Sequence, residues 1–272
     1  MKQIETLTST DRNYTIQSVH HTLQVLETFL DVDGAAQRIT EIGERLGMNK
    51  SRVFRILNTL EQHGFIDQDP NTRQYRLGLR LMSLGEAVRR QLGIVQMADP
   101  VLDELAGQSG ETVNLVVVDG REAVCVAERE SKHSVRLYGE VGRRAPLHVG
   151  GAPKVLLAYM PPEERARIIG GRALPRVTES TVTDAGQLEE ILAQIRRDGY
   201  TVTVGDLDHG AHSIAAPVRD HTGCVVAALS VAGPSHRFSP EKIQCFIQLV
   251  CRAAARISSC LGYDPPQPEN TK

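Results

Sequence analysis

Hydrophobic and polar positions alternate with helical periodicity through the first quarter of the chain. One amphipathic helix is predicted from Ser18 to the segment 31–34. A shorter one is predicted over 40–47, with Thr40 as its N-cap and Gly47 as the left-handed residue that ends it. The apolar faces of these helices would be formed by Val19, Leu23, Leu26, Phe29, Leu30, Ile39, Ile42 and Leu46.

A third predicted helix follows after Met48 and Asn49, with Asn49 as its N-cap, and it ends at Gly64. Its apolar face would comprise Val53, Ile56, Leu57 and Leu60. A short helix, a tight turn containing glycine and a longer helix form a helix-turn-helix, whose second helix enters the major groove of DNA.

The polar face of this third helix has the chemistry of a DNA reader. Arginine and lysine near the start of such a helix can reach guanine O6 and N7, and polar side chains further along suit phosphate contact. The candidates are Lys50, Ser51, Arg52, Arg55, Asn58 and Thr59. The alternative, a surface helix with ordinary charges, agrees less well with the tight turn and with the segment that follows.

That segment, 65–78, predicts a two-stranded hairpin with a turn at 69–72. A hairpin in this place is the wing of a winged helix-turn-helix. Arg73 and Gln74 lie beside its tip, where they can touch phosphate or enter the minor groove. The DNA-binding domain is therefore expected over residues 15–78.

Residues 79–91 predict a helix that links this domain to the rest of the chain, with Leu81, Leu84 and Val88 on one face. Such a face is either a dimerisation surface or packs within its own chain. The pattern leaves both possibilities open.

Residues 92–263 predict a second domain, a mixed sheet with flanking helices. A hairpin is expected at Asp119-Gly120, and the polar segments 1–14 and 264–272 are expected to be flexible or disordered tails. Strands are expected near 111–120, 122–130, 133–139, 200–206, 212–220 and 224–233. Helices are expected near 95–108, 154–160, 162–170, 187–199 and 240–261.

Gly150 and Gly151 precede a predicted helix whose first turn contains Pro153. Glycines permit close backbone approach, and a helix N-terminus offers free N–H groups to a carboxylate or similar anion. An anion site and a plain strand-to-helix turn both fit this segment.

Composition fits two domains with aliphatic cores, because the 272 residues are 41% hydrophobic but only 4% aromatic. The five cysteines are widely spaced and form no CxxC pair, so we expect buried thiols in a reducing cytoplasm rather than disulfides or a zinc site. No apolar run reaches the roughly 20 residues of a membrane span, and the first 14 residues lack the apolar centre of a signal peptide. A cytoplasmic protein is expected.

The net charge of −2 conceals an uneven distribution. Residues 49–80 carry six basic and three acidic side chains, whereas residues 91–272 carry 19 basic and 22 acidic ones. A basic segment in an otherwise acidic chain is typical of a nucleic-acid-binding module, although this small excess alone also fits a solvated surface.

Two other functions are open from the residues alone. An enzyme could use Ser213, His209 and Asp206 as a nucleophilic arrangement, or hold a metal ion with Asp206, Asp208, His209 and His212. The sequence has no nucleophile elbow, HExxH motif or phosphate loop, so we expect neither catalysis nor a cofactor or metal. An architectural DNA binder without a ligand would not need so large a second domain.

The chain resembles the IclR family of bacterial transcriptional regulators over about residues 15–263. The matching stretches, in family order, are SVHHTLQVLETFL, TEIGERLGMNKSRVFRILNTLEQHGFI, YRLGLRLMSLG, PLHVGGAPKVLLAY, RRDGYTVTVGDLDHGAHSIAAPV and GCVVAALSVAGPSHRFSP. No one stretch is decisive, but six in the correct order are highly specific.

The resemblance implies an α+β protein with an N-terminal winged helix-turn-helix and a C-terminal GAF-like mixed α/β effector-binding domain. It implies a homodimer or homotetramer that binds a palindromic operator in double-stranded DNA. Its effector would be a small molecule, an organic or aromatic acid, that changes operator binding. The positions matching the family's effector pocket are Leu137, Gly151, Ala152, Asp206, Ser213 and Ser230.

Two positions depart from the family pattern. Pro153 stands where the family usually has glycine, which removes one backbone N–H at the helix start. Ala232 stands where some acid-binding members have serine. Both changes make the pocket less polar, so we expect a ligand with a larger apolar or aromatic part.

Overall fold

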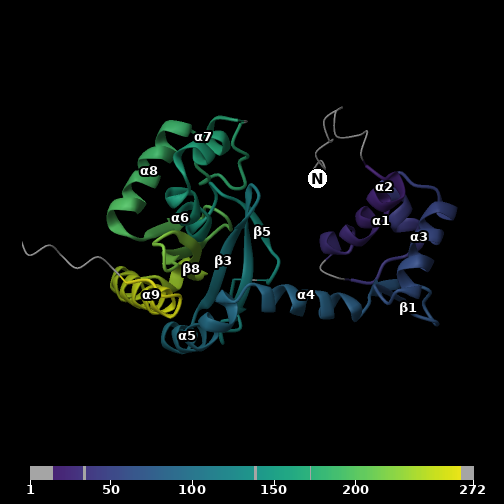
Figure 1. Ribbon diagram of the computed structural model, residues 1–272, viewed down its shortest axis with the longest axis horizontal. Coiled ribbons are helices and arrows are strands. Elements are labelled where there is room, and N and C mark those ends of the chain that lie inside the picture. The colour runs from purple at the N-terminus through teal and green to yellow at the C-terminus, as the bar shows by residue number, and fades with distance from the viewer. Residues whose placement is uncertain (1–14, 33–34, 138–139, 172, 265–272) are drawn as a thin grey trace, which may run out of the picture. The chain divides into compact units, whose positions relative to one another are not determined.

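The computed structural model describes residues 15–32, 35–137, 140–171 and 173–264 (Figure 1). The chain separates between Gln91 and Leu92 into two units with their own cores. The predicted tails, 1–14 and 264–272, lie outside the described residues except for Asp264. No helix in the described ranges combines the length and apolar character that a bilayer span needs.

The N-terminal unit contains the three predicted helices, α1 (Gln17–Glu27), α2 (Ile39–Leu46) and α3 (Lys50–Gln62). A short 3-10 turn, η2 (Leu30–Val32), follows α1. After α3 come an antiparallel hairpin and a longer helix: β1 (Ile66–Gln68), β2 (Tyr75–Leu77) and α4 (Arg80–Gln91). The core of the unit is formed by Val25, Phe29, Ile42, Val53, Leu57, Leu60, Ile66 and Tyr75. These elements form a winged helix-turn-helix.

The turn between α2 and α3 confirms the predicted role of Gly47, which has a left-handed backbone with φ of 63°. The next residue, Met48, donates its N–H to the Gly43 carbonyl at 2.9 Å. A Cβ on Gly43 would lie 2.9 Å from the Met48 carbonyl oxygen, so the turn has no room for a side chain there. Asn49 caps α3 as predicted, because its Oδ1 accepts the Arg52 N–H at 2.9 Å.

Two details of this unit differ from the prediction. Of the apolar residues predicted for the first helix, Phe29 is buried as predicted, but Val19 and Leu23 are half exposed. The core contains Val25 of α1, which was not predicted. Helical spacing in a helix with several apolar residues does not decide which face is buried, and packing against α3 decides it here. α2 begins at Ile39 without Thr40 as its cap, because the Glu41 carboxylate accepts the Arg38 N–H at 2.7 Å.

The C-terminal unit is built on a six-stranded sheet in the order β5-β4-β3-β8-β7-β6. Its strands are β3 (Thr112–Asp119), β4 (Glu122–Arg129), β5 (Arg144–Pro146), β6 (Thr201–Val204), β7 (Ala211–Arg219) and β8 (Val225–Pro234). Each neighbouring pair is antiparallel, so the predicted mixture of parallel and antiparallel strands is wrong. The hairpin at Asp119-Gly120 is confirmed, since Asp119 pairs with Glu122.

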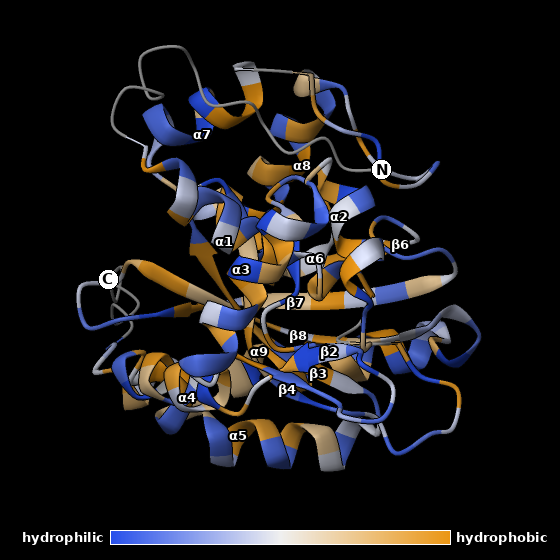
Figure 2. Ribbon diagram, turned by 90° about the vertical axis from the view of Figure 1, so that its right-hand side faces the viewer, coloured by the Kyte–Doolittle hydropathy of each residue, from blue (hydrophilic) through white to orange (hydrophobic). Residues whose placement is uncertain are grey.

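Helices cover both faces of this sheet (Figure 2). On one face lie α5 (Ile94–Ser109) and α9 (Pro240–Cys260). On the other lie α6 (Gly151–Tyr159) and α8 (Ala185–Asp198), with α7 (Pro162–Gly170) beside them. Side chains alternate along a strand. In β8, Ala227, Leu229 and Val231 therefore join the α5–α9 core, and the residues between them face the α6 side.

The strand predicted over 133–139 is not formed at 133–137, and residues 138–139 lie outside the described ranges. Other side chains bind the backbone of this segment. Arg237 Nη1 donates to the Val135 carbonyl at 2.7 Å, and Thr112 Oγ1 donates to the Leu137 carbonyl at 3.3 Å. On the edge of β4 that faces away from β3, the neighbouring strand is β5, which was not predicted.

The expectation of buried cysteines holds for Cys125 alone. Cys251 is half buried, whereas Cys224, Cys245 and Cys260 are exposed. Two of the exposed thiols lie on the outer face of α9, because only one face of that helix packs on the sheet.

Candidate functional site

A cavity of about 110 Å³ lies in the C-terminal unit, between the sheet and the start of α6. Its floor consists of alternate residues from neighbouring strands, which point to the same face of the sheet. All six residues that match the family's effector pocket line this one cavity: Leu137, Gly151, Ala152, Asp206, Ser213 and Ser230. Residues far apart in the sequence are thus brought to one place.

Small side chains on adjacent strands leave this space open. Asn114 on β3 is paired with Ser230 on β8, and Ser213 on β7 is paired with Ala232 on β8. The helix start approaches them closely, since a Cβ on Gly151 would lie 2.8 Å from Ser213 Oγ. Gly151 therefore lets the N-terminus of α6 come down onto the sheet at this point.

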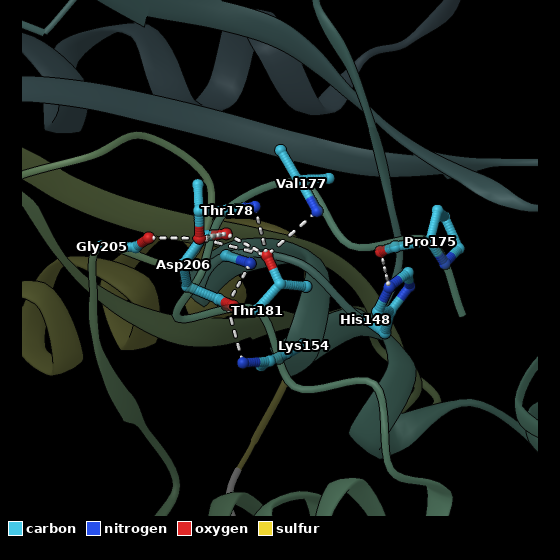
Figure 3. Close-up of polar contacts among 9 residues, drawn as sticks. His148, Lys154, Pro175, Val177, Thr178, Thr181, Gly205 and Asp206 are labelled. Atoms are coloured by element: carbon cyan, nitrogen blue, oxygen red, sulfur yellow. Dashed lines mark hydrogen bonds and ion pairs between the residues drawn. The ribbon is translucent and has the colours of Figure 1, made fainter. Parts of the chain in front are cut away.

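Asp206 in the wall of the cavity belongs to a buried ion pair with Lys154 of α6 (Figure 3). Asp206 Oδ2 accepts hydrogen bonds from Lys154 Nζ at 2.7 Å and from the Gly150 N–H at 2.6 Å. The two side chains are each only 4% exposed. The other carboxylate oxygen, Asp206 Oδ1, is buried and has no hydrogen-bond partner in the described part of the chain.

Two threonines hold the backbone of Asp206 in place (Figure 3). Thr178 Oγ1 donates to the Gly205 carbonyl at 2.7 Å, and Thr181 Oγ1 donates to the Asp206 carbonyl at 2.9 Å. Nearby, His148 is buried, and its Nε2 lies 2.9 Å from the Pro175 carbonyl oxygen. Burial lowers the pKa of His148, which favours its neutral form. The two threonines thus fix the backbone from which the Asp206 carboxylate reaches the cavity.

A second ion pair lies in the cavity wall. Arg143 Nη2 donates to Asp208 Oδ1 at 2.7 Å, and both residues line the cavity. Burial raises the pKa of the Cys125 thiol to about 12, so it stays protonated and a poor nucleophile at neutral pH. Such a lining is suited to binding a ligand rather than to attacking one.

The arrangements required by the enzyme alternatives are not assembled. Asp206 is bound to Lys154, not to a histidine, and Asp208 is bound to Arg143. His212 Nδ1 lies 2.8 Å from Ser235 Oγ, and His209 is exposed. The four side chains imagined as metal ligands therefore have separate partners or face solvent.

The second candidate site is the surface of α3 and the wing. The core side of α3 carries Val53, Leu57 and Leu60. All six polar residues predicted to face DNA are exposed: Lys50, Ser51, Arg52, Arg55, Asn58 and Thr59. In the wing, Arg73 is exposed and has a left-handed backbone with φ of 59°, whereas Gln74 is half buried.

The polar side chains of α3 differ in which neighbour they lie beside. Arg52, Arg55 and Thr59 border a surface groove that α1 lines on its other side, with Ser18 and Thr22 among its residues. On the opposite flank the helix is tied to the wing, because the Glu61 carboxylate accepts the backbone N–H of Gln68 at 3.3 Å. The basic side chains Arg52 and Arg55 therefore lie beside α1, and the other end of α3 is the end held to the wing.

Comparison with known proteins matches both units. Residues 18–70 match the IclR helix-turn-helix domain, and residues 86–259 match the bacterial transcriptional regulator IclR C-terminal domain. The chain belongs to the IclR family. Members of this family are DNA-binding transcriptional regulators with a C-terminal effector-binding domain, so this protein is a transcriptional regulator and not an enzyme.

Individual IclR-family relatives match almost end to end. The HTH-type transcriptional regulator XynR of Escherichia coli (strain K12) is 34% identical over 91% of this chain and 98% of its own. The regulator KdgR of the same organism is 35% identical over 83% of this chain and 86% of its own. An IclR homologue from Microbacterium hydrocarbonoxydans, solved in complex with 4-hydroxybenzoate, superimposes with a TM-score of 0.78 at 29% identity, covering 90% of this chain and 98% of its own.

Sequence reasoning missed several residues that line this IclR-type cavity or hold Asp206 in its wall. Lys154 was assigned only to a helix. A lysine within the apolar stretch GAPKVLLA indicates a buried charge, and a buried charge needs a carboxylate partner. Thr178 and Thr181 carry no such signal, because they reach Asp206 from a segment of irregular backbone. The ion pair between Arg143 and Asp208 joins residues that lie 65 positions apart in the sequence. No pattern in the sequence around either residue predicts this pair.

Proposed function

We propose that this IclR-family regulator binds a small organic acid in the cavity beside Asp206, and that occupancy changes its affinity for a palindromic operator. The observation that carries the proposal is the convergence of all six family-matched residues on one cavity. Binding of a ligand to one of two subunit arrangements shifts the population between them.

The lining supports an acid with two polar groups. A carboxylate fits the N–H groups of Gly151 and Ala152 at the start of α6, together with the hydroxyls of Ser213 and Ser230. Asp206 Oδ1 needs a hydrogen-bond donor, because a buried carboxylate oxygen without one is costly. The effector therefore carries a carboxylate and a donor such as a hydroxyl.

Size and polarity favour a single ring or short chain between these two groups. The cavity volume of about 110 Å³ is of the same order as the roughly 150 Å³ that holds a benzene ring in an engineered apolar cavity. Pro153 and Ala232 line the cavity where relatives can have glycine and serine, so two polar contacts of the family pattern are absent here. The centre of the ligand is therefore apolar. The relative from Microbacterium hydrocarbonoxydans was solved with 4-hydroxybenzoate, an acid that has both polar groups on an aromatic ring.

On DNA, the start of α3 enters the major groove and the wing lies over the backbone. Base contacts are made by Lys50, Ser51, Arg52 and Arg55. Phosphate contacts are made by Asn58, Thr59, Arg73 and Gln74, with Arg73 placed to reach the minor groove. The exposure of Lys50, Arg52, Arg55 and Arg73 supports this division.

Two copies are needed to read a palindrome, with their α3 helices about 34–36 Å apart. Apolar surface for a homodimer is present on α4, where Leu84 and Val88 remain 47% and 54% exposed. A homotetramer would pair two such dimers. The functional parts are then the DNA-binding domain 15–78, the linker helix 79–91 and the effector domain 92–263, acting in the cytoplasm where bacterial DNA lies.

DNA reading is tested with alanine variants in a fluorescence anisotropy titration at fixed salt. Arg52→Ala should cost about 1–3 kcal/mol at the specific site and relax base preference there. Arg73→Ala should weaken specific and non-specific duplexes by the same factor, because phosphate contacts carry no sequence information. If Arg52→Ala binds the selected operator as tightly as the parent, α3 is not the reader.

Effector chemistry is tested with matched ligand pairs on the full-length protein. Calorimetry should give tighter binding for 4-hydroxybenzoate than for benzoate, and weaker binding still for phenol, which lacks the carboxylate. The same order should appear in the concentration of ligand that shifts operator affinity. Equal affinities for 4-hydroxybenzoate and benzoate would contradict the role given to Asp206 Oδ1.

A further inference from the structure

Phe54 is an aromatic side chain on the polar face of α3. It is 54% exposed, whereas the other four phenylalanines of the chain are buried or half buried. A single exposed hydrophobic residue is common on protein surfaces and means little by itself. The position of Phe54, on the helix that faces DNA in this family, is what gives it significance.

Phe54 lies one helical turn after Lys50 and one turn before Asn58, so these three side chains form one strip along α3. All three are exposed, while Val53 and Leu57 on either side of Phe54 in sequence face the core. The surroundings are basic. The first ten residues of α3 contain three basic side chains and no acidic one.

The major groove offers one apolar group on the base edges, the C5-methyl of thymine, and phenylalanine is among the side chains that contact it. The basic residues around Phe54 match the phosphates on either side of such a groove. We propose that Phe54 packs against a thymine methyl and makes the protein select thymine at one position of each operator half-site. This inference rests on the proposed function, in which α3 is the reading helix.

A second copy of the chain is the other surface that could cover Phe54. A two-fold interface built on this strip would place like surfaces together, so Lys50 and Arg55 of one copy would approach the same residues of the other. Repulsion between these cations opposes that packing. Charge therefore favours the polyanionic DNA groove as the partner.

The test compares thymine with uracil, which lacks only the methyl group. A consensus site is selected from random duplexes with the purified full-length protein, and each thymine is then replaced singly by deoxyuridine. At one position of each half-site, replacement should weaken binding of the parent protein about fourfold, the effect of losing one buried methyl. Phe54→Ala, which loses the contact in both subunits, should bind the thymine duplex about as weakly as the parent binds a duplex with uracil at that position in both half-sites.

The decisive result is coupling between residue and methyl group. Phe54→Ala should show no further loss on the uracil duplex, and Phe54→Leu should retain part of the preference. Gln62→Ala, which changes an exposed residue at the far end of α3, is the matched control and should keep the full preference. The inference is overturned if no single replacement of thymine by uracil weakens binding of the parent protein. It is also overturned if the replacement weakens binding of Phe54→Ala by the same factor as it weakens binding of the parent.

Two further measurements are needed. Sedimentation distinguishes a DNA contact at Phe54 from a subunit contact, and arginine variants distinguish the role of Phe54 from the reading role of α3. Sedimentation of Phe54→Ala should give the parent's oligomeric state, and a shift to smaller species would make Phe54 a subunit contact and overturn the inference. Arg55→Ala is measured on the same duplexes and should bind them more weakly. Full operator binding by Arg52→Ala would refute the reading role of α3 itself. If the arginine variants bind more weakly and the uracil test fails, only the role of Phe54 is refuted.

Discussion

Lys154 and Asp206 form an ion pair that is removed from water, with Nζ 2.7 Å from Oδ2. The pair joins α6 to the turn between β6 and β7, and both of these segments border the cavity. Taking two charges out of water costs free energy, which a close partner and additional hydrogen bonds offset. The Gly150 N–H supplies one such bond.

Removing one partner of this pair should destabilise the protein strongly. Lys154→Met leaves the Asp206 carboxylate buried without its cation, which costs about 3–5 kcal/mol of unfolding free energy. Asp206→Asn should lose less, because the amide oxygen can still accept a hydrogen bond. Urea unfolding followed by circular dichroism measures both, with exposed Lys132→Met as the control. A loss of under about 1 kcal/mol for Lys154→Met would show that water reaches the pair.

Adding one methyl group at Gly151 should reduce ligand binding. Its Cβ would lie 2.8 Å from Ser213 Oγ, so Gly151→Ala pushes α6 away from the sheet or fills the cavity between them. The double variant with Ser213→Ala removes the obstructing oxygen and also one hydroxyl that binds the carboxylate. It should therefore bind 4-hydroxybenzoate more tightly than Gly151→Ala but more weakly than Ser213→Ala alone, as measured by calorimetry. Gly107→Ala, where a Cβ meets nothing within 4 Å, is the matched control. An unchanged affinity for Gly151→Ala would place the ligand elsewhere.

Local patterns were sufficient to predict the helix-turn-helix. Gly47 and Asn49 act through hydrogen bonds and backbone angles of their immediate neighbours, so their roles follow from a few consecutive residues. The resemblance to the IclR family then located the cavity, because it names positions on several strands at once. Ser213 and Ser230 come together through strand pairing that periodicity alone does not specify.

Features that depend on distant partners were not predictable in the same way. The segment 133–137 alternates like a strand, yet Arg237 and Thr112 bind its carbonyl oxygens from elsewhere in the fold. The exposure of Val19 and Leu23 on α1 was not predicted for a related reason, since burial depends on where α3 lies and not on the spacing of these two residues. Long-range contacts decide between locally equivalent alternatives.

Thiol reactivity should distinguish the five cysteines. In the folded protein, iodoacetamide should modify Cys224, Cys245 and Cys260, which are exposed, and leave Cys125 unmodified. The pKa of Cys125 is raised to about 12 by burial, so almost none of it is thiolate at neutral pH. Mass spectrometry of proteolytic peptides gives the extent of labelling at each position, and labelling in urea should reach all five. Rapid labelling of Cys125 in the folded state would show that the cavity opens widely.

Stability should fall as the solution is acidified, and His148 should account for part of the loss. Burial lowers the pKa of His148 below the ordinary value of 6.5, so above that pH the histidine is neutral in both states and contributes nothing. Below it, the unfolded chain takes up a proton that the folded chain does not, and the unfolding free energy falls by at most about 1.4 kcal/mol per pH unit. His148→Gln should flatten this slope between roughly pH 6.5 and 5, without abolishing it, because burial also lowers the pKa of His212. Urea unfolding across this range measures the slope, and the exposed His133→Gln variant should keep the slope of the parent. If His148→Gln and the parent lose stability in parallel, His148 takes up its proton equally in both states.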